Sequence, residues 1–224
     1  MSGLREEAAR RLCAARARRA FTDLRDLEAR AKLREDELQT LAELGAFAGL
    51  GLRRREALWQ VAALETDGRG LLARLPPPGD PSPLSEMTAA ERTAADLRAS
   101  GLTVGPHPFA HLRPALRARG VLPAAALLRA RHGSEVRVAG MVITRQRPGT
   151  ARGMCFLTLE DETGLCNVVV TPDVFAAHRR LLVTEPGLIV QGPLERRDGV
   201  TNLRAARLDP LAEPTPAIPS RDFH

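Results

Sequence analysis

Arginine is the residue type with which this sequence could do most chemistry, and that chemistry would be the binding of phosphate groups. Lysine and arginine together number 33 against 27 aspartates and glutamates, for a formal net charge of +6, and Lys32 is the one lysine among them. The planar guanidinium group binds phosphate through paired hydrogen bonds, which favours a nucleic-acid partner. A GC-rich genome would enrich arginine too, together with alanine, leucine, glycine and proline. Charge alone therefore leaves both explanations open.

The positions of the arginines say more than their number. Arginines lie in or beside two loops between predicted strands. These are QRPGTARG at residues 146–153 and the loop ending at Gly199. The first group is Arg145, Arg147 and Arg152, the second is Arg196 and Arg197, and Arg204 and Arg207 follow on the last strand. In an OB fold these two loops border the groove that binds oligonucleotides. We therefore expect both groups at one rim of a groove, although any single arginine could be a solvated loop residue.

Phe156 is the candidate for base stacking. Successive side chains of a strand point to opposite faces, so Cys155, Leu157 and Leu159 would form the core set and Phe156 would stand on the open face. Stacking contributes about 1–3 kcal/mol per base. The alternative is that Phe156 packs under a neighbouring loop. Since the chain has no tyrosine, one tryptophan and six phenylalanines, we expect a groove that tracks the DNA backbone rather than reading bases.

A second phosphate-binding feature is predicted near the N-terminus. The segment GAFAGLGLRRR, residues 45–55, resembles the turn of a helix-hairpin-helix, in which glycine amides meet a phosphate at the start of a helix. Arg53, Arg54 and Arg55 would then face the DNA backbone. Gly3 and Leu4 resemble the second half of another such hairpin. Plain packing between helices would also explain this pattern.

No catalytic or metal-binding constellation is visible in the sequence. The five histidines are scattered, and neither a carboxylate nor a cysteine lies beside His107 and His111 to complete a metal site. Asp161 and Glu162 fall in a tight turn, where they are interpreted as turn-forming and solubilising residues. Nucleotide-binding loops and Ser/His/Asp patterns are also missing. We predict a binding protein with no catalytic residue, metal or cofactor in this chain.

The patterning predicts an α+β multidomain protein with two structured ends. Leucines at helical spacing over residues 3–65 predict short helices, with starts at residues 22–23 and 34–36 and a resumption at 53–64. Thr88 and Glu91 predict a capping box for a helix over residues 89–100, ended by Gly101. Further short helices are expected at 112–119 and 123–131.

From residue 134 the pattern becomes that of strands. The predicted strands are 136–147, with a bulge or bend near Gly140, then 153–160, 165–170, 187–194 and 200–208, and a helix at 172–182 precedes the fourth strand. Three strands, a helix and two strands is the order of a five-stranded OB-fold β-barrel.

Five regions follow from these patterns. They are a helix-hairpin-helix region at 1–73, a proline-rich linker at 74–85, a helical connector at 86–133, the OB domain at 134–211 and a disordered tail at 212–224. No apolar run is long enough to span a membrane, and the N-terminus lacks the features of a secretory signal. We expect a cytoplasmic protein whose three cysteines are reduced thiols.

The order of these motifs resembles a known family. The stretches at residues 23–61, 91–121 and 136–182, above all GAF…LGLRRREALW, GPHPF and GMCFLTLEDETG, resemble bacterial C-family DNA polymerases. More narrowly, they resemble the error-prone, damage-inducible branch of the polymerase III alpha-subunit family. The resemblance covers residues 3–211.

The resemblance implies that this chain is the C-terminal piece of such a polymerase. It would be the product of a truncated gene, a piece of a longer gene expressed separately, or one part of a split polymerase. The phosphoesterase-like domain and the palm with its metal-binding aspartates have no counterpart here, so polymerase chemistry and Mg²⁺ would belong to the parent. The family implies that the helix-hairpin-helix region grips duplex DNA and that the OB domain holds single-stranded template. It also implies accessory mutagenesis proteins that link the polymerase to the sliding clamp.

Two other functions stay open at this point. The pattern V-R-V-A-G…F-L-x-L-x-D-x-T-G also resembles the anticodon-binding OB domain of class II aminoacyl-tRNA synthetases, although that domain normally leads into a catalytic domain. The OB face could instead dock another polypeptide.

Overall fold

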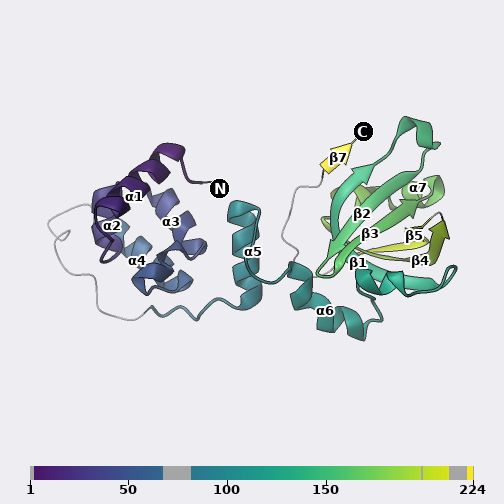
Figure 1. Cartoon of the computed structure of the whole chain (residues 1–224), viewed down its shortest axis with the longest axis horizontal. Coiled ribbons are helices and arrows are strands. Elements are labelled where there is room, and N and C mark those ends of the chain that lie inside the picture. Colours follow the sequence, from purple (N-terminus) through teal and green to yellow (C-terminus); the bar gives the residue numbers. More distant parts are fainter. Residues whose placement is uncertain (1–2, 68–81, 198, 212–220, 224) are drawn as a thin grey trace. The chain divides into compact units, whose positions relative to one another are not determined.

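The chain folds into two compact units, Met1–Thr103 and Val104–His224 (Figure 1). The computed structural model describes residues 3–67, 82–197, 199–211 and 221–223. Each unit has its own hydrophobic core and is considered by itself.

In the first unit, every regular element of the described residues is a helix. Its elements are α1 (Glu6–Arg18), α2 (Leu24–Ala31), α3 (Glu35–Glu43), the 3-10 helix η1 (Ala46–Leu50), α4 (Arg54–Asp67) and α5 (Ala89–Ser100). The predicted leucine stripe forms the core of the unit, in which Leu24, Leu27, Leu38 and Leu41 are buried around Phe47. Helical periodicity therefore located the core correctly.

Local capping sets the helix ends as the sequence predicts. The Asp23 carboxylate accepts a hydrogen bond from the Asp26 backbone N–H at 2.8 Å and starts α2. Thr88 and Glu91 form the predicted capping box of α5, in which the Thr88 N–H donates to the Glu91 carboxylate at 2.7 Å. Gly101, at φ 72°, ends the helix in the left-handed conformation that glycine adopts without strain.

The second unit is the predicted OB barrel. Its strands are β1 (Glu135–Gln146), β2 (Cys155–Asp161), β3 (Gly164–Val170), β4 (Gly187–Arg197), β5 (Val200–Arg204), β6 (Arg207–Pro210) and β7 (Arg221–Phe223). Two helices precede β1, namely α6 (Pro108–Ala118) and the 3-10 helix η3 (Ala124–Leu128). The short 3-10 helix η4 (Gly149–Ala151) lies between β1 and β2, and helix α7 (Pro172–Thr184) lies between β3 and β4. The pairing order β1-β2-β3-β5-β4 closes through β4 on β1, and β3 and β5 pair in parallel.

The long strand β1 closes the barrel by pairing on both edges. Its first half, to Met141, pairs with β4, and its second half pairs with β2. The predicted bend lies here. A Cβ on Gly140 would stand 2.8 Å from the Leu159 Cβ, and the register shifts between Val142 and Thr144. Glycine is therefore required at this close approach of β1 to β2.

The prediction of one last strand over residues 200–208 was wrong, because the structure divides it into β5 and β6. Leu194 pairs with Leu203 but Gln191 pairs with Arg207, so one extra residue is inserted between the two strands. A Cβ on Gly192 would lie 1.9 Å from the Arg204 carbonyl oxygen. The chain bulges directly over this glycine, which a periodicity argument on β5 alone does not detect.

The expected connector is divided between the two units. Helix α5 packs with the first unit, whereas α6 contributes Phe109 and Leu116 to a core cluster of the second with Met141 and Ile189. The second connector helix starts at Pro108, earlier than predicted, and the segment predicted as helical over 123–131 is the short 3-10 helix η3.

Two other predicted regions fall largely outside the described residues. These are the linker, from residue 74 to 81, and the tail, at residues 212–220 and 224. Within the predicted tail, however, residues 221–223 form β7, parallel to β1 at Thr144–Gln146. The edge of β1 beyond Met141 is no longer paired with β4, which leaves it available to this strand. Within the described part of the chain, no helix is long and apolar enough to cross a membrane.

Candidate nucleic-acid interface

The outer face of the barrel presents three rows of side chains across neighbouring strands. The core set of β2, β3 and β5 points inward, so the alternate residues point outward. The strand register aligns them: the first row is Phe156, Val169 and Arg204, the second is Thr158, Asn167, Asn202 and Glu195, and the third is Glu160, Leu165, Val200 and Arg197. This face therefore combines an aromatic ring, amides, aliphatic groups, two arginines and two carboxylates, Glu160 and Glu195.

Phe156 lies on this open face as the alternation predicts. Its side chain is 37% exposed, while Cys155, Leu157 and Leu159 are buried in the barrel core. Gln146 of β1 and Val169 of β3 are its neighbours in the sheet. The position suits stacking on a base, which stays a prediction.

The arginines near the first loop have three different environments. Arg145 points toward the end of α7, where its guanidinium donates to the Leu182 carbonyl at 2.8 Å and to the Glu185 carbonyl at 2.6 Å. The Arg147 guanidinium stacks over the Phe175 ring at 4.3 Å from the centroid. Arg152 is exposed at φ 50°, directly after η4. Arg145 is thus held by backbone carbonyls, whereas Arg147 and Arg152 are exposed, and their contact with DNA stays a prediction.

The second loop is anchored to η3. The Arg196 guanidinium donates to the backbone carbonyls of Leu127, at 3.0 Å, and Leu128, and its own N–H donates to His132 Nδ1 at 3.0 Å. Arg197 is exposed opposite Val200 at the end of the hairpin. Further along, Arg204 pairs with Glu195 at 3.0 Å and Arg207 with Asp209 at 3.3 Å.

The expectation that both loops share one rim was wrong. The first loop enters β2 beside the end of β3, where Cys155 pairs with Val170. The second loop enters β5 beside the start of β3, because β3 and β5 run parallel from the Asn167–Asn202 pair. The two arginine groups therefore flank the open face from opposite ends of β3. Sequence order alone could not distinguish these arrangements.

The predicted hairpin in the first unit is present. After α3, Gly45 at φ 74° and Gly51 at φ 78° enclose η1, and α4 follows. Its three arginines were expected to face the DNA backbone together, but they lie in different environments. Arg53 is 64% exposed, 3.5 Å from the Glu86 carboxylate, whereas Arg54 is largely buried against Asp96 at 2.7 Å and Arg55 binds Glu91 at 2.7 Å. Arg54 and Arg55 hold α5, and Arg53 remains the more accessible cation.

The second predicted hairpin half, at the start of the chain, has similar geometry. Gly3 has φ 90° and packs against Thr40, and α1 begins shortly after it. The Arg5 guanidinium binds the buried Glu37 carboxylate at 2.8 Å, and the Arg34 N–H donates to the same carboxylate at 2.8 Å. The hydrogen bond from Arg5 is the largest cause that lowers the pKa of Glu37, to about 2. This pair links the starts of α1 and α3.

Sequence reasoning missed the role of Asp161. Its buried carboxylate accepts hydrogen bonds from the Ala124 N–H at 2.7 Å, the Thr163 N–H at 2.7 Å and the Arg113 guanidinium at 2.8 Å. Arg113 also binds Glu162 at 2.5 Å. Burial alone would lower the pKa of Arg113, but the two carboxylates raise it. The D-x-T turn and its bond from Thr163 are local and visible in the sequence, but Ala124 and Arg113 lie 37 and 48 residues away and could not be predicted from it.

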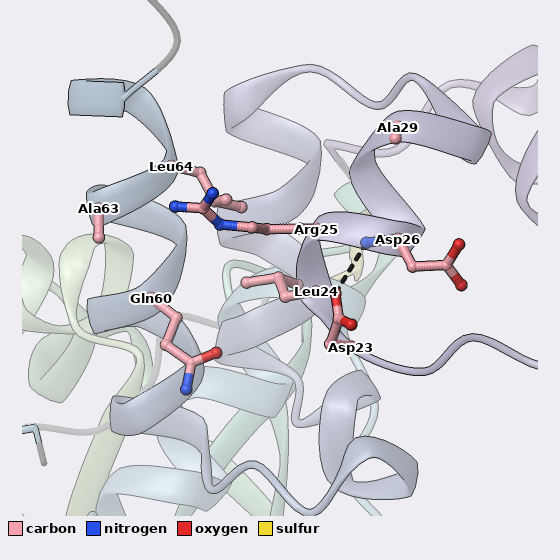
Figure 2. Close-up of a pocket in the computed structure, with 8 residues that line it drawn as sticks. All are labelled: Asp23, Leu24, Arg25, Asp26, Ala29, Gln60, Ala63 and Leu64. Atoms are coloured by element: carbon pink, nitrogen blue, oxygen red, sulfur yellow. Dashed lines mark hydrogen bonds between the residues drawn. The ribbon is translucent and has the colours of Figure 1, made fainter. Parts of the chain in front are cut away.

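One hollow in the first unit is unrelated to these arginines. A cavity of about 600 Å³ lies between α2 and α4, lined by Asp23, Leu24, Arg25, Asp26, Ala29, Gln60, Ala63 and Leu64. Figure 2 shows Arg25 extended toward Leu64 and the capping bond between Asp23 and Asp26. Its carboxylates are already engaged, since Asp23 caps α2 and Asp26 binds Arg30 at 2.8 Å. This cavity is therefore not assigned to the interface.

Metal-ligating side chains are dispersed over the described part of the chain. Across the described ranges, His, Cys, Asp and Glu side chains do not gather in threes at a position that could hold an ion. The three cysteines are free, and burial raises the pKa of Cys166 to about 12, which makes it a core residue and not a nucleophile.

Comparisons with known proteins agree with both predicted modules. Residues 1–57 match the helix-hairpin-helix motif, and residues 136–211 match the OB-fold nucleic acid binding domain. The chain is 45% identical over 224 residues to the error-prone DNA polymerase of Alkalilimnicola ehrlichii, covering 99% of this chain and 22% of that protein. It is 45% identical over 228 residues to the error-prone DNA polymerase of Burkholderia pseudomallei, covering 99% and 21%.

Among solved structures, asparaginyl-tRNA synthetase from Pyrococcus horikoshii is 26% identical, with a TM-score of 0.31, over 36% of this chain and 20% of that one. This likeness is too slight to bear on function. The chain spans about a fifth of the length of the curated relatives it matches. The matches show that nearly the whole of this chain is homologous to one part of the error-prone DNA polymerases, and that it contains a helix-hairpin-helix motif and an OB-fold nucleic acid binding domain.

Proposed function

We propose that this chain is the DNA-binding portion of an error-prone, translesion DNA polymerase. In this proposal the open face of the OB barrel holds single-stranded template, and the hairpins of the first unit hold duplex DNA. The observation that carries it is the three-row face, where exposed Phe156 lies between the arginine-bearing loops at the two ends of β3. An aromatic platform flanked by cations is how OB folds bind single strands.

The proposal assigns separate roles to the two kinds of contact. Arg152 and Arg197 lie exposed beside the face and would bind phosphates, which makes binding salt-dependent. Phe156 would stack on a base, a contact with little dependence on salt. In the first unit Arg53 and the Gly51 turn at the start of α4 would bind the duplex backbone.

Nucleotide transfer itself belongs, in this proposal, to other domains of a complete polymerase, and Mg²⁺ with it. A role in DNA repair after damage, in the cytoplasm, and contacts with accessory mutagenesis proteins that reach the sliding clamp are part of the same proposal. They follow from kinship with the error-prone polymerases.

The test is a comparison of three ligands by fluorescence anisotropy. These are a DNA strand of about 16 nucleotides, the upper end of what one OB fold covers, a primer hairpin with a single-stranded overhang, and a transfer RNA. We expect the two DNA ligands to bind more tightly than the transfer RNA. Preference for the transfer RNA would support the anticodon-binding alternative. If the chain bound none of the three ligands, protein docking would be left as the role of the barrel.

A further inference from the structure

A groove next to the second loop gathers exposed aliphatic side chains from three segments. Leu128 of η3 is 70% exposed, Leu165 of β3 is 61% exposed and Val200 of β5 is 48% exposed. They line one cavity of about 430 Å³ together with Ala124, Ala125, Leu127, Thr163, Gly164, Cys166, Asn167, Gly199 and Thr201. Exposed aliphatic groups gathered around one hollow are typical of a binding site.

The walls of the groove are fixed by hydrogen bonds to η3. The Ala124 N–H donates to Asp161 at 2.7 Å, and the Ala125 N–H donates to the Thr163 hydroxyl at 3.1 Å. On the other side, Arg196 binds the Leu127 and Leu128 carbonyls. The groove is therefore formed before any ligand arrives, which lowers the cost of binding.

The groove continues the open face of the barrel. Leu165 and Val200 lie in the third row, two residues before the Asn167–Asn202 pair on each strand. From Val169, beside Phe156, to Leu165 the strand covers about 13 Å. That exceeds the roughly 3.4 Å between stacked bases, so Phe156 and the groove would bind different bases of one strand.

The polar groups at this place suit a nucleobase. The Asn167 side chain is exposed at the groove and can both donate and accept hydrogen bonds, as a base edge requires. The Thr163 hydroxyl, by contrast, is already bound to Asp161 at 2.6 Å. Arg197 stands at the same end of the hairpin, opposite Val200, where a phosphate would follow.

We propose that this groove holds one unstacked base of a single DNA strand, with the Leu128, Leu165 and Val200 side chains against its faces and Asn167 at its edge. The proposal rests on the proposed function and adds to it a second base site without an aromatic ring. A strand would then run along β3 from Phe156 to the groove.

The experiment replaces the apolar walls and compares them with a matched control. The test variant is Leu165→Ala with Val200→Ala. The control is Leu122→Ala with Val183→Ala, also one leucine and one valine with exposed side chains in the second unit. Binding of a thymidine strand of about 16 nucleotides is measured at several salt concentrations. We expect the test variant to bind about fivefold more weakly with an unchanged salt slope, and the control to bind like the unaltered chain.

A second readout locates the base. In a series of strands, each with 2-aminopurine at a different position, the fluorescence should rise where the labelled base leaves the stack. The test variant should lose this rise at one position, and Phe156→Ala should keep the rise at that position. Equal affinities of test and control variants would overturn the groove proposal alone. Absence of DNA binding by the unaltered chain would instead overturn the proposed function.

The test variant could lose affinity by unfolding, so Asn167→Ala serves as a second variant. It removes the exposed amide and no apolar wall. We expect it to narrow the affinity differences between thymidine, cytidine and adenosine strands while its melting temperature stays that of the unaltered chain. Unchanged differences would contradict the assignment of Asn167 to a base edge.

Discussion

At the scale of single residues, the partner of a guanidinium group decides what it does. Arg145 and Arg152 belong to the same predicted group, yet Arg145 binds the carbonyls that end α7 and Arg152 is exposed. Replacing Arg145 with alanine should lower the free energy of unfolding by about 1.5–3 kcal/mol, as for hydrogen bonds from a charged group. Urea unfolding checks this.

Arg152→Ala provides the comparison. It should leave stability unchanged and make the logarithm of DNA affinity less steep against the logarithm of salt concentration, because one phosphate contact is lost. If Arg145→Ala changed only the salt slope and not the unfolding curve, its structural role would be refuted.

Phe156 is expected to act without charge. Phe156→Ala should weaken binding of single-stranded DNA by about 1–3 kcal/mol with the salt slope unchanged, because stacking releases no counterions. Phe156→Leu keeps an apolar side chain and removes the aromatic face. Anisotropy titrations of both variants, with melting curves, decide between roles. If both variants melted at a much lower temperature and lost binding in proportion, the role of Phe156 would be packing and not base stacking.

Glu37 gives the first unit a stability that depends on pH. Its pKa is lowered to about 2 in the folded state, foremost by the hydrogen bond from Arg5, against about 4.3 in an unfolded chain. Its contribution is therefore complete above about pH 4.3 and is lost as the pH falls toward 2. Glu37→Gln should lower stability by about 1–3 kcal/mol at neutral pH.

That difference should shrink in acid. Urea unfolding of both proteins at neutral pH and at about pH 3 measures it. A difference that is the same at both pH values would show that the carboxylate charge contributes nothing.

Sequence predicted the direction of Phe156 but not the roles of the arginines. The direction follows from strict alternation along β2, a local rule. The role of Arg145 depends on carbonyls 37 and 40 residues away, and that of Arg196 on η3, 68 and 69 residues away. A long flexible side chain can reach many partners, and only the fold selects one.

At the scale of elements, the predictions succeeded where a hydrophobic period repeats and failed where backbones cross. β1, β2, β3, α7 and most of β4 lie within a few residues of their predicted ranges. The separation of β5 from β6 is caused by the close approach of the chain to Gly192, a contact between two strands. Long-range pairing also explains why the prediction that both arginine-bearing loops lie at one rim was wrong. The end of β3 beside which each loop lies depends on which strands pair in parallel.

The segment that leads into α5 affects the hairpin it covers. Glu86 lies 3.5 Å from Arg53, the most exposed arginine of the hairpin, and would compete with a bound phosphate for it. Neutralising this carboxylate, Glu86→Gln, should tighten binding of blunt duplex DNA about twofold to fivefold, since one contact of modest strength is freed.

The control removes the same charge elsewhere in the first unit. Glu28→Gln lies on α2, away from the hairpin. Affinities of both variants for the same blunt hairpin, at one salt concentration, are compared with the unaltered chain. An equal gain for the two would mean that only net charge matters, and a loss for Glu86→Gln would show that Glu86 positions Arg53 for DNA.

At the scale of the whole molecule, the chain joins two units with separate cores and separate nucleic-acid-binding domains. The sequence predicted a linker at residues 74–85 and a connector at 86–133, whereas the units divide between Thr103 and Val104. The boundary depends on α5, whose Asp96 binds Arg54 in the first unit, and on α6, whose Arg113 binds Asp161 in the second. Both helices were predicted within one connector, and these long-range partners assign them to different units.

Two binding domains on one chain should act together on a DNA that offers both a duplex and a single strand. Once one domain is bound, the other binds as an intramolecular event. We expect a hairpin with a single-stranded overhang to bind at least about tenfold more tightly than either a blunt hairpin or a free strand. Phe156→Ala should reduce this advantage and leave the blunt hairpin unaffected, whereas Arg53→Ala should weaken both hairpins. If the overhang hairpin bound no better than the tighter of its two parts, the units would act independently, and a joint hold on a primer-template junction would be excluded.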